Sequence, residues 1–135
     1  MIDSNNYTIN ELFTISADGV ATTQGAIRNL GKVTTLAGNI TLGASARITS
    51  AGYNTVSPLD SLIITGGINT ANAAYVLTVD VQEGMRISGV ISGAGGVTKV
   101  GNDTLSLTAN ALRGTSHGIY HSTGHGVIKS PRSTT

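Results

Sequence analysis

The sequence contains no cysteine and no tryptophan, only one phenylalanine, and just 11% charged residues. The absence of cysteine excludes disulfide bonds and thiolate metal sites. Because aromatic residues make up 4% of the chain, Val, Ile, Leu and Ala are predicted to fill the interior. The formal net charge of +1 gives no electrostatic reason to expect a nucleic-acid partner.

Membrane-targeting signals are also scarce. No run of about 18 apolar residues occurs, so no segment is predicted to cross a membrane as a helix. The first six residues, 1–6, are not followed by the basic and apolar regions of a signal peptide. If the protein acts outside the cell, we therefore expect this chain to be a segment of something longer.

Glycine and small polar residues are abundant instead. The chain has 18 glycines but only two prolines. Thr, Ser and Asn are expected to form the solvent-exposed surface in place of charged residues. Strands favour β-branched residues, and turns favour Gly and Asn. The composition therefore predicts an all-β protein with frequent turns.

Internal repetition is the main organisational signal. Each repeat reads turn residue, small residue, apolar, variable, apolar, small polar, and the starts lie 22, 23 and 20 positions apart in the numbering. The four segments are 38–43, 60–65, 83–88 and 103–108. Two apolar residues separated by one position indicate a strand with one buried face. A recurrence of this length without helices is typical of a solenoid.

Stacking these segments predicts an all-β parallel β-helix, or β-solenoid, with about 20–23 residues per rung. Two aliphatic ladders should then fill its interior. The first comprises Ile40, Leu62, Met85 and Leu105, and the second comprises Leu42, Ile64, Ile87 and Leu107. Ile68 and Ile91 hold the same offset in consecutive repeats, and 74–81 and 96–100 are further predicted strands.

The ends of the chain fit the repeat less well. We divide the sequence into an N-terminal rung or cap (1–24), a β-helix repeat segment (25–112), and a tail rich in Gly, Ser and Thr that contains the histidines (113–135). The tail is predicted to be loosely ordered.

Residues 87–107 carry a family resemblance. The run ISGVISGAGGVTKVGNDTLSL is similar to the passenger-associated transport repeat of autotransporter passenger domains, and includes Gly93, Gly95, Gly96, Lys99 and Gly101. The segments 25–30, 38–43 and 46–50 resemble an autotransporter passenger as well. The likeness spans about residues 25–110.

The resemblance implies a right-handed parallel β-helix. It also implies a secreted adhesin-type segment of a virulence-associated protein, displayed at the surface of a Gram-negative bacterium or released from it. Its partners would be neighbouring rungs of a longer chain, other copies of itself, or a host-surface protein or glycan. Outer-membrane attachment would run through a translocator domain, which this sequence does not contain. No cofactor, catalytic residue or enzymatic activity is expected.

One column of carboxylates has the composition of a cation-binding site. Stacking places Asp60, Glu83 and Asp103 immediately before successive strands, about 5 Å apart if the rungs are adjacent. Carboxylate oxygens at that spacing suit a hard cation such as calcium. Turn preference explains the same acidic residues without a ligand.

Two other functions remain open from the sequence. A short solenoid with uncapped ends exposes strand edges that can pair with another copy, which predicts a self-assembling extracellular fibre subunit. A carbohydrate-binding or carbohydrate-cleaving β-helix of the tail-spike kind is the second alternative.

Overall fold

The computed structural model describes residues 6–16, 25–30, 33–51, 62–108, 119–121 and 128–129. This part of the chain is all-β and contains no helix. Its strands are two to six residues long and pair in parallel within three sheets. The described residues therefore include no helix that is long and apolar enough to cross a membrane.

Sheet A contains six strands. In spatial order they are β1 (Asn6–Ile9), β4 (Val33–Leu36), β7 (Leu62–Ile64), β10 (Met85–Ile87), β13 (Leu105–Leu107) and β15 (Ile128–Lys129).

Sheet B contains four strands and sheet C five. The order in sheet B is β11 (Ile91–Ser92), β8 (Ile68–Asn69), β5 (Ile40–Leu42) and β2 (Phe13–Ile15). The order in sheet C is β14 (Ile119–His121), β12 (Gly96–Val100), β9 (Val76–Val81), β6 (Ala46–Ser50) and β3 (Ile27–Asn29).

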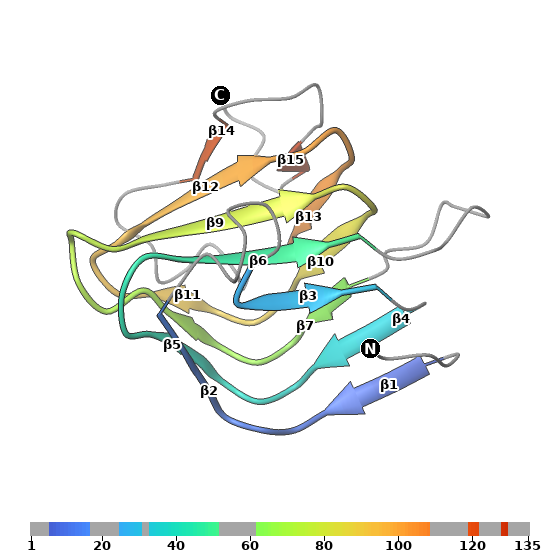
Figure 1. Cartoon of the computed structure of the whole chain (residues 1–135), viewed down its shortest axis with the longest axis horizontal. Helices are drawn as coiled ribbons and strands as arrows, with labels where there is room; N and C mark the ends of the chain where they lie inside the picture. Colours follow the sequence, from blue (N-terminus) through green and yellow to red (C-terminus); the bar gives the residue numbers. More distant parts are fainter. Residues whose placement is uncertain are drawn as a thin grey trace.

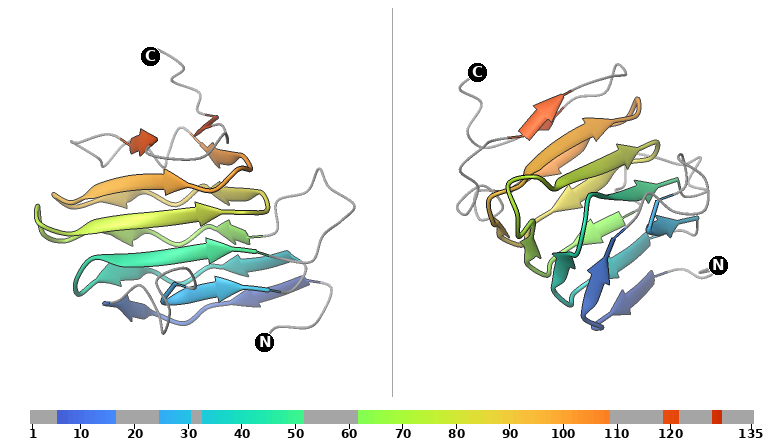
Figure 2. Two further views of the ribbon diagram at one scale, coloured as in Figure 1. Left: turned by 45° about the horizontal axis from the view of Figure 1, so that its top comes forward. Right: turned by 60° about the vertical axis from the view of Figure 1, so that its left-hand side comes forward.

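The chain passes through sheets A, B and C in turn. Strands β1, β2 and β3 form the first layer, and each following group of three, up to β12, lies over the group before it. Figures 1 and 2 show these layers rising in sequence order from the N-terminal end to the C-terminal end. The stacked parallel sheets are compatible with a β-solenoid.

Alternation of side chains explains why each layer needs its neighbours. In β5, β7 and β13 the first and third residues are buried, and the middle residue is partly exposed. A strand this short buries too few side chains to be stable alone, so stability comes from stacking. The inward residues of all three sheets meet in one apolar core.

The two predicted ladders are confirmed over three layers. Leu62, Met85 and Leu105 are register partners and are fully buried. The second column contains Ile64, Ile87 and Leu107, and it continues into the second layer at Leu36. The proposition that distant segments lie directly over each other therefore holds in sheet A.

The placement of Ile40 and Leu42 in these ladders is wrong. Both residues are buried, but they belong to β5 in sheet B, where Ile40 pairs with Phe13 below and Ile68 above. Thr34 is the residue beneath Leu62. The apolar–variable–apolar pattern occurs in strands of different sheets, so pattern matching joined strands from two faces of the stack.

The uniform spacing of 20–23 residues is also wrong for the N-terminal layers. Thr34 pairs with Leu62, which is 28 positions later, and Ile48 pairs with Val79, which is 31 positions later. Residues 52–61, which are outside the described residues, separate β6 from β7 in the sequence and account for the larger spacing. From β7 onward the prediction holds, since Leu62, Met85 and Leu105 are 23 and 20 positions apart.

Several smaller predictions about strands are confirmed. Ile68 pairs with Ile91, and β12 spans the predicted residues 96–100. Within 1–24, β1 and β2 pair with β4 and β5 and so form a layer. Within 113–135, β14 and β15 pair with β12 and β13. The domain boundaries themselves stay predictions.

A column of glycines lines the corner between sheets A and B. Gly38, Gly66 and Gly89 each follow a sheet A strand by the same two positions. A Cβ atom at Gly38 would collide with the carbonyl oxygen of Glu11 beneath it. At Gly66 it would collide with that of Gly38, and at Gly89 with that of Gly66. Each glycine therefore allows its layer to approach the one below.

Candidate functional site

The segment that resembles the passenger repeat forms one complete circuit, from β10 through β11 and β12 to β13. Its glycines lie at all three corners of the stack, with Gly89 in the column between sheets A and B. At the corner between sheets B and C, Gly93 has a φ of +94°, a region that favours glycine. A Cβ atom at Gly95 would lie 2.5 Å from the Tyr75 carbonyl oxygen. Gly96 differs, because a Cβ atom there would meet nothing within 4 Å.

Thr70 joins this corner to the layer below. Its buried hydroxyl donates to the carbonyl oxygen of Ser92 at 2.9 Å and accepts a hydrogen bond from the Gly95 amide at 2.9 Å. The close approach of Gly95 is thus fixed by a polar side chain, and the corner has a structural role.

Lys99 lies in the apolar core. It points inward from β12 above Val79, which in turn lies above Ile48, and its side chain is 0% exposed. The prediction that Val, Ile, Leu and Ala fill the interior is therefore incomplete, because a lysine continues the column of Ile48 and Val79. On its other side, the register partner of Lys99 is His121 of β14.

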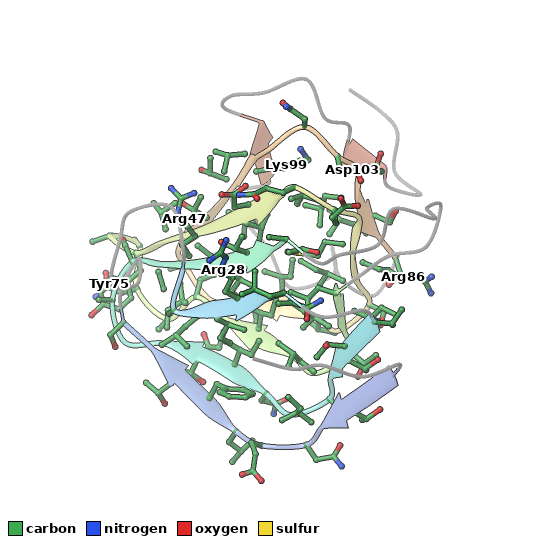
Figure 3. All side chains as sticks on the ribbon, turned by 45° about the vertical axis from the view of Figure 1, so that its right-hand side comes forward. Arg28, Arg47, Tyr75, Arg86, Lys99 and Asp103 are labelled. Carbon is green, nitrogen blue, oxygen red and sulfur yellow. The ribbon has the colours of Figure 1, made fainter. Side chains whose placement is uncertain are left out.

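The Lys99 ammonium closes the corner between sheets C and A. Nζ donates a hydrogen bond of 2.7 Å to the Gly101 carbonyl oxygen. Gly101 has a φ of +90° and crosses the Val81 backbone so closely that a Cβ atom would lie 2.5 Å from the Val81 carbonyl oxygen. Figure 3 shows Lys99 near Asp103, which lies two residues before β13.

Burial governs the protonation of this lysine. Desolvation lowers the pKa of Lys99 from its ordinary value of 10.5, while the negative charges of Asp103 and Asp80 act in the opposite direction. A fully covered amine can position the backbone, but it cannot reach a substrate. We assign Lys99 to the geometry of the corner.

We predict that Lys99→Met changes the pH dependence of stability. The folded state binds the Lys99 proton more weakly than the unfolded chain does. The wild-type free energy of unfolding should therefore rise as pH increases from the lowered pKa toward 10.5. Methionine has no proton to lose, so the stability of the variant relative to wild type should be greatest near neutral pH and should fall as pH rises.

Urea unfolding followed by far-ultraviolet circular dichroism at several pH values measures this difference. Arg28→Met is the matched control, since Arg28 is an exposed cation on β3 in the same sheet. Its curve should run parallel to that of wild type, because arginine does not titrate in this range. If the free energy of unfolding of wild type and of Lys99→Met changed in parallel with pH, the burial of the Lys99 ammonium and its lowered pKa would be contradicted.

The predicted cation column is described only in part. Glu83 and Asp103 occupy equivalent positions, each two residues before the paired residues Met85 and Leu105. Asp60 lies outside the described residues. Asp103 Oδ1 accepts a hydrogen bond of 2.7 Å from the Thr104 amide, which is the behaviour of a turn residue. Among the residues that are described, no group of three metal-ligating side chains comes together.

The outer side of sheet C carries an ion pair that sequence reasoning missed. Arg47 Nη1 lies 3.1 Å from Asp80 Oδ2, and Gln82 Nε2 donates to the same oxygen at 3.2 Å. Asp80 is 6% exposed. Arg47 and Asp80 are 33 positions apart, so only the pairing of β6 with β9 brings them together. Alternation within β9 was the one available signal, because it places Asp80 on the outer side.

Outward positions of the other sheets are mixed. In sheet A, Ile63, Arg86 and Ser106 are register partners. Figure 3 shows Arg86 projecting on a different side of the molecule from Arg28 and Arg47.

Comparisons with known proteins identified no relationship: no family model, no curated protein and no solved structure matches this chain.

Proposed function

We propose that this chain is a structural and adhesive segment of a secreted, surface-displayed bacterial protein of the autotransporter type, folded as a right-handed parallel β-helix. Its role is to form a stiff rod that spaces and presents an adhesive surface. The observation that carries the proposal is the continuity of buried columns and backbone hydrogen bonds across successive layers.

Backbone hydrogen bonds run along the stack without interruption at the start of sheet B. The Phe13 amide donates to the Asn39 carbonyl oxygen at 2.9 Å. Ile40 then donates to Gly67 at 2.8 Å, and Ile68 donates to Val90 at 2.9 Å. Such a series, together with the aliphatic columns inside it, resists bending because every layer is held by the next. Rigidity of this kind suits a spacer.

The outer side of sheet C supports the adhesive part of the proposal. Arg28 is exposed on β3, and within the described part of the chain no residue forms an ion pair or hydrogen bond with it. The neighbouring Arg47 is already paired with Asp80. An exposed guanidinium that has no partner among the described residues suits an acidic group of a host-surface protein or glycan.

Surface display tests the proposal. The chain would be placed between a signal peptide and a β-barrel translocator in a laboratory Gram-negative bacterium, and adhesion to host cells would be compared with that of cells displaying the translocator alone. We expect a protease-resistant surface product and increased adhesion. Arg28→Glu should reduce adhesion at equal display, whereas Arg86→Glu, on another sheet, should reduce it less.

The outcomes separate the parts of the proposal. A chain that does not reach the surface in a protease-resistant form would contradict the secreted β-helix. A displayed chain that adds no adhesion would contradict the adhesive role. Equal effects of the two arginine substitutions would remove sheet C as the adhesive face.

A further inference from the structure

The first layer ends the described stack, and its edge has the properties of an interface. Strands β1, β2 and β3 each lie at one edge of their sheets, so among the described strands each has a partner on one side only. Figure 2 shows all three at the N-terminal end of the stack. Edges that lack a partner among the described strands are a template for another layer.

Apolar side chains at this end are incompletely covered. Ile9, Phe13 and Ile27, one from each strand, are only partly buried against the core. Their register partners in the second layer are Leu36, Ile40 and Ile48, which are 2%, 0% and 0% exposed. Leu12, at the corner between β1 and β2, is 78% exposed. A further layer would therefore bury apolar surface and pair the edges.

Glu11 interrupts the corner column at this end. It follows Ile9 by two positions, as Gly38 follows Leu36, and the paired strands on either side fix its equivalence to Gly38. In the next three layers this position is glycine, because a Cβ atom there would collide with the carbonyl oxygen of the layer beneath. Glu11 has a Cβ atom that points in the direction from which the next layer would approach.

We propose that Glu11 blocks end-to-end association of this chain with a second copy through its first layer. A second copy is the relevant occupant because its parallel layers have the same three-sheet cross-section as the face they would cover. By analogy with Gly38, Gly66 and Gly89, the Cβ atom of Glu11 points to where a further layer of this fold would place its corner carbonyl oxygen. The strand edges and the apolar side chains of the first layer favour a further layer, and the Glu11 side chain opposes it.

Two substitutions of Glu11 distinguish the steric effect of its Cβ atom from the effect of its negative charge. Glu11→Gly removes the Cβ atom and restores the residue found in the layers above. Glu11→Ala removes the carboxylate but keeps the Cβ atom. We expect wild type and Glu11→Ala to sediment as monomers over a range of concentrations. Glu11→Gly should form oligomers whose mass rises with concentration and which appear as end-to-end rods by negative-stain microscopy.

Circular dichroism first establishes that each variant is folded, and double variants with Phe13→Asp then place the contact. Charge at Phe13 should return Glu11→Gly to the monomer, because it lies on the face that the second copy covers. Filaments of the wild type, a monomeric Glu11→Gly, or equal association of Glu11→Ala and Glu11→Gly would each overturn the proposal.

Discussion

Replacing Ile64 by alanine should lower the free energy of unfolding by about 2–5 kcal/mol, whereas replacing Ile63 should lower it by less than about 1 kcal/mol. The two isoleucines are adjacent in β7 but face opposite sides of sheet A. Ile64 is fully buried in a column between Leu36 and Ile87, and Ile63 is partly exposed on the outer side. Alanine at Ile64 leaves a cavity enclosed by two neighbouring layers.

Equilibrium urea unfolding, followed by far-ultraviolet circular dichroism, measures both variants against wild type. Comparing the two variants controls for intrinsic strand propensity, because isoleucine is replaced by alanine at neighbouring positions of one strand. A shift of the register by one residue would exchange the buried and exposed positions. If Ile63→Ala proved the more damaging change, the alignment of β7 with β4 and β10 would be wrong.

The predictability of the ladders follows from the regularity of the later layers. Leu62, Met85 and Leu105 lie in circuits of 23 and 20 residues, so a nearly fixed period aligns them. Ile40 was misplaced because β5 carries the same period-2 pattern as the sheet A strands. Period 2 identifies a strand with a buried face, but it does not specify to which of three sheets that strand belongs.

The polar features of the candidate site were less predictable. The resemblance to the passenger repeat pointed to Lys99, but composition predicted an aliphatic interior. Its burial depends on a carbonyl partner at Gly101 that only the folded corner supplies. The pairing of Arg47 with Asp80 likewise depends on the register of β6 against β9, which the irregular spacing of the early layers hides.

The glycine column provides the second test with a large expected effect. Gly66→Ala should destabilise the protein by about 3 kcal/mol, because overpacking against a close-packed neighbour forces backbone movement. Here the added Cβ atom would collide with the Gly38 carbonyl oxygen, and Gly89 lies on the Gly66 carbonyl oxygen in turn. A shift at Gly66 therefore disturbs three consecutive layers at one corner.

Gly67→Ala is the matched control at the next position. Its Cβ atom would lie 3.4 Å from Asn39 Oδ1 and 3.6 Å from the Val90 carbonyl oxygen, which are ordinary contacts. The Gly67 amide keeps its 2.9 Å hydrogen bond to Asn39 Oδ1. Because alanine restricts the unfolded chain more than glycine does, this variant should be unchanged or more stable by up to about 1 kcal/mol. Opposite signs for two adjacent glycine-to-alanine changes, measured by urea unfolding, are expected only if layers cross at Gly66, and equal effects would contradict the stacked corner.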